Sequence, residues 1–380
     1  MSGPRRRRLL TVAHSYCVDL NRRLAQELGA IGEWDVTAVG PARFRGDFGW
    51  HTFEPHASEA CATVPIPAHF SRRVHLMLYG RRLRELLKEP WDLVHCWEEP
   101  YVASAAQVAF SAGRSVPVVF ATFQNIAKSY PPPFNWFERY TMARAAGVIA
   151  FGRTVFDVVS ARTPTHPPMR VISPGVDVAR FRPDADARAR VLGSYGWRDG
   201  TPVIGFVGRF VEQKGIQLLM DALDRLQAPW RALLVGGGPL QSDLLAWSRR
   251  YGDRVRIELA VRHDEVPAYL NAMDLLCAPS QTTPQWREQF GRMLIEAFAC
   301  GVPVLASNSG EIPHVVADAG LIVDEKDVAG WTEAMARMIG DKALRVRLAE
   351  RGRSRAETVF AWPVVARQHL DFFEDIVSRS

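Results

Sequence analysis

The sequence predicts an α/β protein made of two doubly wound domains. Its length of 380 residues exceeds the size at which a single hydrophobic core keeps growing. Short β-branched runs recur between helical patterns, as they do in parallel sheets covered by helices. These runs form two series, separated by the segment 172–184, which Pro174, Gly175 and Pro183 punctuate.

Six apolar runs in each series are the expected strands. The first series covers residues 9–13, 34–39, 92–96, 116–120, 147–151 and 169–173. The second covers residues 202–208, 231–237, 254–259, 274–279, 302–307 and 320–324. Since parallel strands need crossover connections, each series predicts one doubly wound domain. We expect an N-terminal domain over 1–177, a C-terminal domain over 178–360, and a helix over 361–380 that could pack back on the N-terminal domain.

The composition is typical of a globular protein in a reducing compartment. Hydrophobic residues make up 47% of the chain and charged residues 23%. No stretch approaches the roughly 20 apolar residues that cross a bilayer, and no apolar signal-peptide core follows the N-terminal arginines. The cysteines show no CxxC or Cys/His cluster that would hold zinc, so we interpret them as reduced thiols. We therefore expect a cytoplasmic protein.

The net charge of +6 lies entirely in the N-terminal half. Residues 1–178 contain 21 Lys and Arg against 15 Asp and Glu, whereas residues 179–380 contain 26 of each kind. A positively charged N-terminal half suggests an anionic partner, which could be the inner face of a membrane, an anionic acceptor or nucleic acid. The segment 69–89 surrounds an apolar stripe with arginines and predicts a basic amphipathic helix, or a pair, suited to anionic lipid. The alternative is a core-facing stripe with a solvated arginine face.

Two cations follow the first strand of the second series. In the segment GRFVEQKG, Arg209 comes directly after Gly208, and Lys214 follows five residues later. Open α/β sheets bind ligands at the carboxyl ends of their strands, and two cations there would suit a diphosphate. The alternative is an exposed loop whose lysine begins a helix. The next strand ends in three glycines that include Gly237, a second loop able to admit a ligand.

The densest signal is the segment 287–316, where Gly291 stands near the start of a predicted helix. Glu288 lies before the first turn and Glu296 about two turns into the helix, so both can face one ligand. Amides of the first helical turn are free donors suited to phosphate oxygens. The alternative is an amphipathic helix capped by Glu288.

These motifs resemble the donor site of the GT-B glycosyltransferases, specifically the retaining, group 1 enzymes of glycosyltransferase family 4. The family pattern Glu-x-Phe-Gly-x4-Glu, followed by Ala-x-Ala-x-Gly-x-Pro-Val, matches Glu288, Phe290, Gly291, Glu296, Ala297, Ala299, Gly301, Pro303 and Val304. The segments GRFVEQKG, ISPGVDVARFRP, DLVHCW and FAWPVVARQHL are also similar to segments of that family. The resemblance spans nearly the whole chain.

The resemblance implies a role for each of these residues. Arg209 and Lys214 would hold the donor diphosphate, Glu288 would contact the transferred sugar, and both cations and this carboxylate would be catalytic. The implied donor contacts are Gly208, Gly237, Phe290, Gly291, the main-chain amides of Arg292, Met293 and Leu294, and Glu296 on the ribose.

The resemblance also implies an activity. The protein would move a hexose-type sugar from a nucleotide-sugar donor to a carbohydrate or lipid-linked acceptor, in polysaccharide or glycolipid biosynthesis. It would retain the anomeric configuration and need neither a metal nor a cofactor, because the two cations replace the ion. Two Rossmann-like domains would face a cleft, with the acceptor on residues 1–177 and the donor on residues 178–360.

Two positions depart from the family pattern. Many relatives have a Gly-Gly loop after the first strand, where this chain has AHSYCVDLNRRL with His14. Many also have a histidine after a Thr-Phe pair, where this chain has Gln124. We expect His14, His95 and Gln124 near the acceptor, with structural hydrogen bonding as the alternative for the two histidines.

Two other functions remain open from the sequence. One is a different GT-B activity, such as a phosphorylase or a sugar-nucleotide epimerase. The other is a basic nucleic-acid-binding protein, although no RNP, zinc or helix-turn-helix signature is present and the C-terminal half is neutral. We expect no nucleic-acid partner.

Overall fold

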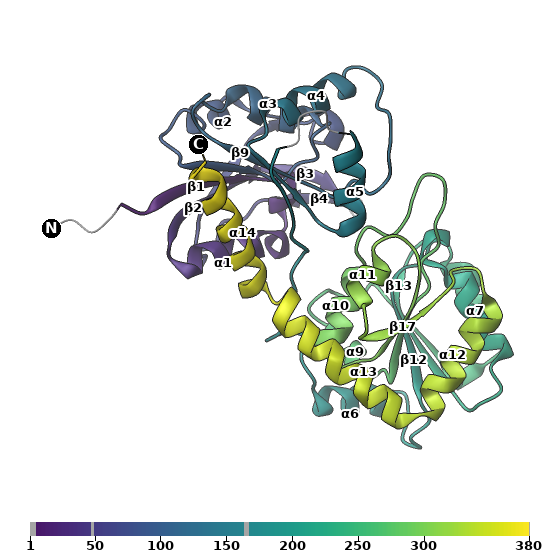
Figure 1. The fold of residues 1–380 in the computed structure, drawn as a ribbon. Coiled ribbons are helices and arrows are strands. Elements are labelled where there is room, and N and C mark those ends of the chain that lie inside the picture. Colours follow the sequence, from purple (N-terminus) through teal and green to yellow (C-terminus); the bar gives the residue numbers. More distant parts are fainter. Residues whose placement is uncertain (1–4, 47–48, 163–166, 380) are drawn as a thin grey trace. The chain divides into compact units, whose positions relative to one another are not determined.

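A computed structural model describes residues 5–46, 49–162 and 167–379 and divides the chain into two compact units. Unit 1 comprises Met1–Ser173 and Trp362–Ser380, and unit 2 comprises Pro174–Ala361. Both are parallel sheets covered by helices (Figure 1). Among the described residues, none of the helices has the length and apolar character needed to cross a membrane.

Unit 1 contains a seven-stranded parallel sheet in the order β11-β10-β9-β8-β1-β2-β5. Its strands are β1 (Arg7–Val12), β2 (Trp34–Pro41), β5 (Ala62–Ile66), β8 (Leu93–Cys96), β9 (Val118–Thr122), β10 (Gly147–Ala150) and β11 (Met169–Val171). The six strands predicted for the first series are confirmed. The sequence did not reveal β5, because Pro65 interrupts it; a proline is tolerated on this strand since it lies at the sheet edge.

Helices cover both faces of this sheet (Figure 1). They are α1 (Arg23–Ile31), α2 (Arg81–Leu86), α3 (Ala103–Ser111), α4 (Phe134–Arg144), α5 (Arg153–Arg162) and α14 (Trp362–Val377), with short turns η1 (His14–Cys17), η2 (Asp19–Arg22) and η3 (Val74–Leu76). Successive strand residues point to opposite faces, so Leu9 joins the core under α1 and α14 while Leu10 joins the core under α2 and α3.

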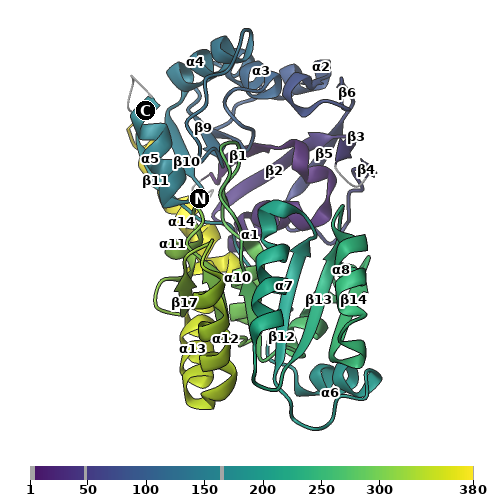
Figure 2. The same cartoon turned by 90° about the vertical axis from the view of Figure 1, so that its right-hand side faces the viewer.

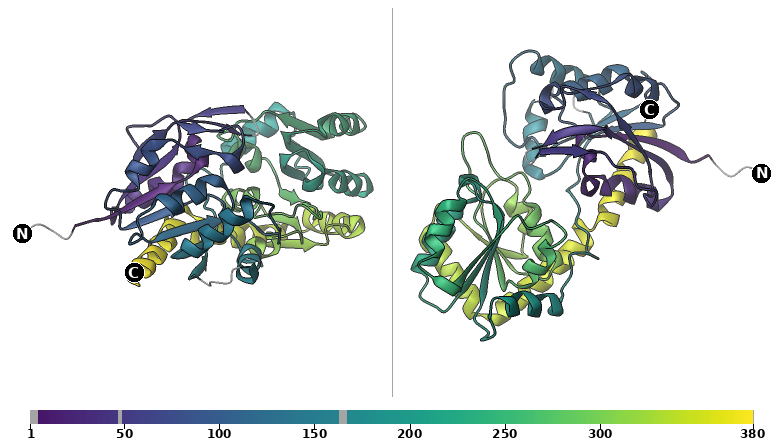
Figure 3. Two further views of the ribbon diagram at one scale, coloured as in Figure 1. Left: turned by 90° about the horizontal axis from the view of Figure 1, so that it is seen from above. Right: turned by 180° about the vertical axis from the view of Figure 1, so that it is seen from behind.

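The C-terminal helix α14 belongs to unit 1. Val365, Leu370 and Phe373 are buried in the same core as Leu24 and Leu28 of α1. Figure 3 shows the yellow C-terminal helix beside the purple helix α1. The expectation that this helix packs back on the N-terminal part of the chain is confirmed.

The expectation of a basic amphipathic helix, or a pair, over 69–89 is wrong for most of that segment and holds only for residues 81–86. That segment forms β6 (Ala68–His69), η3, β7 (Leu78–Tyr79) and the six-residue helix α2, which begins only after Gly80. The hydrogen bond from the Gly80 amide to the Pro67 carbonyl holds the segment in an antiparallel strand pair before the helix. Within α2, Leu83 and Leu86 are buried and the arginines are exposed, as the core-facing alternative requires. A second hairpin pairs β3 (Arg43–Gly46) with β4 (Gly49–Thr52).

Unit 2 contains a six-stranded parallel sheet in the order β14-β13-β12-β15-β16-β17. Its strands, all predicted, are β12 (Val203–Arg209), β13 (Arg231–Gly237), β14 (Val255–Leu259), β15 (Leu275–Ala278), β16 (Val304–Ser307) and β17 (Gly320–Val323). The chain runs outward from β12 through β13 to β14 (Figure 2). It then returns to place β15 on the other side of β12. The topological switch point, where open α/β sheets bind ligands, therefore lies between β12 and β15.

Two apolar cores flank this sheet. The helices are α6 (Ala185–Ser194), α7 (Ile216–Arg225), α8 (Gln241–Ser248), α9 (Val266–Asn271), α10 (Arg292–Ala299), α11 (Ile312–Val316), α12 (Val328–Gly340) and α13 (Lys342–Arg355), with η4 (Glu212–Lys214), η5 (Gly252–Arg254) and η6 (Ala356–Phe360). Side chains of α7 and α12 share one core, and those of α9 and α10 share the other.

Candidate active site

An ion pair lies at the switch point of unit 2. Lys214 ends the turn η4 that follows β12, and Glu288 lies in the loop that follows β15. The Lys214 Nζ is 2.5 Å from the Glu288 Oε2, and the two side chains are only 15% and 7% exposed. Two of the predicted catalytic residues, 74 positions apart, are thus brought together at the carboxyl ends of the two central strands.

Neighbouring groups fix the position of Glu288. The Ser280 hydroxyl donates to Glu288 Oε2 at 2.8 Å, and the Glu311 amide donates to the Glu288 carbonyl at 3.0 Å. Gly310 adopts a left-handed φ of 54°, and a Cβ there would collide with the same carbonyl oxygen. Only glycine therefore lets the loop after β16 close over the main chain of Glu288.

The loop that carries Lys214 is held just as closely. Gly215 has a φ of 68°, and a Cβ there would collide with the carbonyl oxygen of Pro279. The ring centroid of Trp286 lies 5.4 Å from the Lys214 Nζ. The ammonium group therefore has a carboxylate and an aromatic ring as neighbours, and both attract a cation.

Arg209 is the last residue of β12, and its side chain is exposed. It pairs in register with Gly237, the last residue of β13, while Gly208 pairs with Gly236. A Cβ on Gly236 would collide with the Gly208 carbonyl, so these glycines allow the two strand ends to approach closely. The predicted cation and both predicted glycines thus share one edge of the sheet.

Helix α10 begins directly after Gly291, and the buried ring of Phe290 packs edge-on against Phe360, with centroids 5.8 Å apart. Arg292 and Met293 occupy the first turn, where amides have no intrahelical acceptor. The Leu294 amide differs from the expectation, because it donates to the Gly291 carbonyl at 2.9 Å. The amide proton of Leu294 is therefore already used within the chain and is not free to be donated to a phosphate oxygen.

Glu296 lies on α10 and is 8% exposed. Its Oε1 is 3.1 Å from the Nε2 of His263, whose ring packs against Phe181 with centroids 5.5 Å apart. Sequence reasoning missed His263 and Ser280. His263 follows the end of β14 by four residues and Ser280 follows the end of β15 by two, and this closeness to a strand end was the available signal.

A second group of polar side chains lies at the switch point of unit 1, between β1 and β8. The buried carboxylate of Glu98 accepts hydrogen bonds from the His14 amide and the Tyr79 hydroxyl, at 2.6 and 3.0 Å, and lies 2.6 Å from the His14 Nδ1. Burial favours neutral His14, but the charge and hydrogen bond of Glu98 outweigh it and raise the pKa of this imidazole above its ordinary value.

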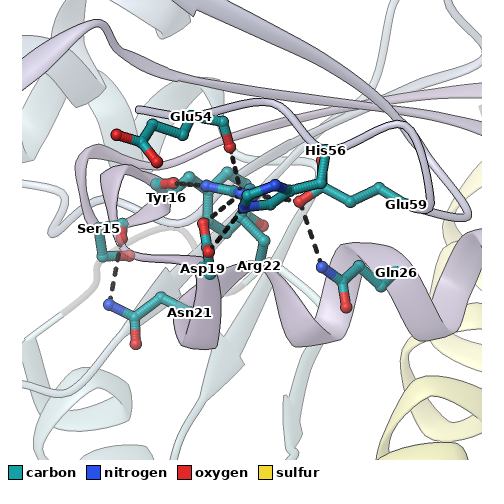
Figure 4. Close-up of polar contacts among 9 residues, drawn as sticks. All are labelled: Ser15, Tyr16, Asp19, Asn21, Arg22, Gln26, Glu54, His56 and Glu59. Atoms are coloured by element: carbon teal, nitrogen blue, oxygen red, sulfur yellow. Dashed lines mark hydrogen bonds and ion pairs between the residues drawn. The ribbon is translucent and has the colours of Figure 1, made fainter. Parts of the chain in front are cut away.

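The loop around His14 owes its conformation to Arg22, whose side chain is fully buried (Figure 4). The guanidinium donates to Glu59 and to the carbonyls of Tyr16 and Glu54, at 2.7, 2.7 and 2.8 Å, and also pairs with Asp19. This buried arginine therefore ties the turns after β1 to the segment that contains Glu54 and Glu59.

His95 and Gln124 have different surroundings. His95 is fully buried beside Phe373 of α14, and its Nδ1 is 3.1 Å from the Thr11 hydroxyl. This position corrects the expectation of an acceptor contact and favours the structural alternative, because no ligand can reach the ring. Gln124 lines a cavity of unit 1, and its amide nitrogen donates to the Ile126 carbonyl at 2.7 Å.

Comparison with known proteins defines the class. The family described as "Glycosyl transferases group 1" matches residues 188–355, and that described as "Glycosyltransferase Family 4" matches residues 19–180. The chain belongs to these group 1, family 4 glycosyltransferases, and its two Rossmann-like units have the GT-B fold.

Particular relatives are similar over much of the chain. A GDP-mannose-dependent alpha-(1-6)-phosphatidylinositol monomannoside mannosyltransferase of Mycobacterium tuberculosis is 30% identical over 308 residues, or 77% of this chain and 78% of the relative. A D-inositol 3-phosphate glycosyltransferase of Corynebacterium jeikeium is 32% identical over 60% of this chain and 57% of the relative. The matched region thus spans less than three-fifths of several of these relatives.

Solved structures support the same fold. A sucrose-phosphate synthase from Thermosynechococcus elongatus matches with a TM-score of 0.75 at 22% identity. The match covers 99% of this chain and 100% of the synthase chain. An Anabaena protein in complex with UDP and glucose has a TM-score of 0.71 at 17% identity over 97% of this chain, which again covers all of that structure.

Proposed function

We propose that the protein is a retaining glycosyltransferase that moves a hexose-type sugar from a nucleoside-diphosphate sugar to a carbohydrate or lipid-linked acceptor. The observation that carries the proposal is the ion pair of Lys214 and Glu288 at the switch point of unit 2. A partly buried cation there can meet a diphosphate, and the carboxylate beside it can accept hydrogen bonds from sugar hydroxyls.

The chemistry follows from where charge develops. When the bond between the sugar carbon and the diphosphate breaks, its electron pair stays on the diphosphate. Lys214, held in place before any donor arrives, and Arg209 at the end of β12 would stabilise that charge. Two cations supply what a metal ion would otherwise provide, so we propose that the reaction needs no metal.

The acceptor would bind to unit 1 through His14 and Gln124. A raised pKa favours the imidazolium, in which the Nδ1 proton is directed at Glu98 and the Nε2 proton can be donated to a ligand oxygen. Relatives named for phosphatidylinositol monomannosides and for D-inositol 3-phosphate support a polyol or glycolipid acceptor, and the first also supports GDP-mannose as a donor to test.

We also propose that unit 1 meets an anionic membrane surface on the cytoplasmic side. Phe70 and Trp50 are 66% and 43% exposed, and Arg43 and Arg72 lie over the Trp50 ring. Exposed aromatic rings beside arginines suit a lipid headgroup layer. The charge would come from exposed arginines of the segment 69–89, namely Arg72, Arg73, Arg81, Arg82 and Arg84. Replacing these five by Gln should weaken binding to anionic vesicles, and unchanged, salt-insensitive binding would contradict the idea.

A donor screen tests the main proposal. Thermal stabilisation by nucleotide sugars, including GDP-mannose and UDP-glucose, should identify the donor, and NMR of the fresh product should show the anomeric configuration of the donor. Activity should survive EDTA. An inverted product would contradict the retaining mechanism, and loss of activity in EDTA would show that the two cations are insufficient.

A further inference from the structure

Unit 1 contains a cavity of about 440 Å³ beside the carboxyl end of β9. This volume lies in the usual range of small-molecule sites. Its apolar wall comes mainly from α4, with contributions from the loop after β8 and from α5. The main contributors are Tyr101, Trp136, Tyr140, Met142, Ala143 and Val159.

Three of the charged groups in the wall, those of Glu99, Glu138 and Arg162, already have partners within the protein. The Glu99 carboxylate accepts hydrogen bonds from the Thr122 hydroxyl and the Phe123 amide, at 2.6 and 2.8 Å. Both Glu138 oxygens accept from the Arg162 guanidinium at 2.8 Å. A sugar needs many unoccupied polar partners, whereas this wall mainly offers apolar surface, which favours a hydrocarbon ligand.

Two aromatic side chains that line the cavity are exposed to solvent. Trp136 and Tyr140, one helical turn apart on α4, are 60% and 46% exposed. Arg139 lies between them in sequence, is exposed, and makes no ion pair with any residue that the structure describes. An apolar cavity with an unpaired cation among its lining residues matches an amphiphile with an anionic end.

We propose that this cavity binds the hydrocarbon chain of a lipid-linked acceptor and that Arg139 binds the phosphate at the end of that chain. The inference rests on the proposed function, since it specifies which acceptor the enzyme takes. The chain packs against Trp136, Tyr140 and Met142. A phosphate at Arg139 then holds the polar part of the acceptor outside the cavity, near Gln124 at the end of β9.

Calorimetric titration with dodecyl phosphate, kept below its micelle concentration, tests the proposal. Ala143→Leu fills the cavity and should weaken binding roughly tenfold or more, since overpacking a site costs about that much affinity. Arg139→Gln should weaken dodecyl phosphate binding about fivefold but leave dodecanol binding unchanged. Arg114→Gln, which removes an exposed arginine elsewhere on unit 1, is the matched control and should bind like the parent protein.

Several outcomes would overturn the inference. Dodecyl phosphate could bind no more tightly than inorganic phosphate, Ala143→Leu could bind it unchanged while retaining its melting temperature, or methyl glycosides could compete for the cavity. The assay needs no donor and no turnover. Failure to bind the chain in a protein that still transfers sugar would therefore reject only this inference, whereas chain binding without transfer from any donor would reject only the proposed function.

Discussion

Replacing Lys214 by methionine tests whether the ion pair at the switch point serves the reaction or only the fold. Loss of a preorganised charge at a reacting centre costs about 2.7 to 4 kcal/mol, so Lys214→Met should lower kcat roughly a hundred- to thousandfold. The stability cost should be smaller, about 1 to 3 kcal/mol, because Glu288 loses one partner but keeps its hydrogen bond from Ser280.

A double-mutant cycle with Glu288→Gln separates the two roles. In thermal unfolding, the double variant should lose less stability than the sum of the single variants, since neither charge is left buried and unpaired. In sugar transfer, the double variant should stay as slow as the slower single variant, because neither change restores charge at the diphosphate. Recovery of kcat in the double variant would refute the catalytic assignment.

Nucleotide affinity gives the matched comparison. Glu288→Gln should impair transfer while leaving the affinity for the free nucleoside diphosphate largely intact. Glu296→Gln should reduce that affinity, because a ribose contact is present in both the ground and the transition state. Calorimetry with the diphosphate measures both. Near-native transfer rates in Lys214→Met and both glutamine variants, all folded, would remove the main support for this donor site.

The remaining predictions concern groups that shape the two units. Gly310→Ala should displace Glu288 and lower activity at least tenfold, whereas Gly193→Ala, where an added Cβ meets nothing, should leave activity unchanged and raise the melting temperature. His369 is fully buried, and burial lowers its pKa from 6.5 to about 4. As the pH falls from 6.5 to 4, His369 therefore takes up a proton in the unfolded chain before it does so in the folded one. The free energy of unfolding of unit 1 should fall by roughly 3 kcal/mol across that window, and His369→Leu should reduce this pH dependence in unfolding titrations. Arg22→Met should destabilise unit 1 by about 3 to 5 kcal/mol in denaturant unfolding, because it leaves a buried carboxylate unpaired; a cost below 1 kcal/mol would contradict that account.

Local sequence patterns were enough to predict most of the strands of the fold. All twelve predicted strands are present, because buried parallel strands appear as continuous apolar runs that can be recognised in isolation. The donor motifs were equally visible, since each follows the end of one of those strands. The segment 69–89 shows the limit of this approach. Its arginine and leucine spacing suggests a helix, but pairing of β6 with β7 takes up the first half of the segment.

These local patterns could not predict contacts between residues far apart in the sequence. The pairing of Lys214 with Glu288 requires β15 to return beside β12, and the alternation of runs is the same for any strand order. His95 has the same local sequence signal as His14, since both lie at or just after a strand end, yet α14 buries one while the other keeps an accessible ring edge. The residue types and their strand ends can thus be read along the chain, whereas strand order and helix packing determine which of them meet and which of them a ligand can reach.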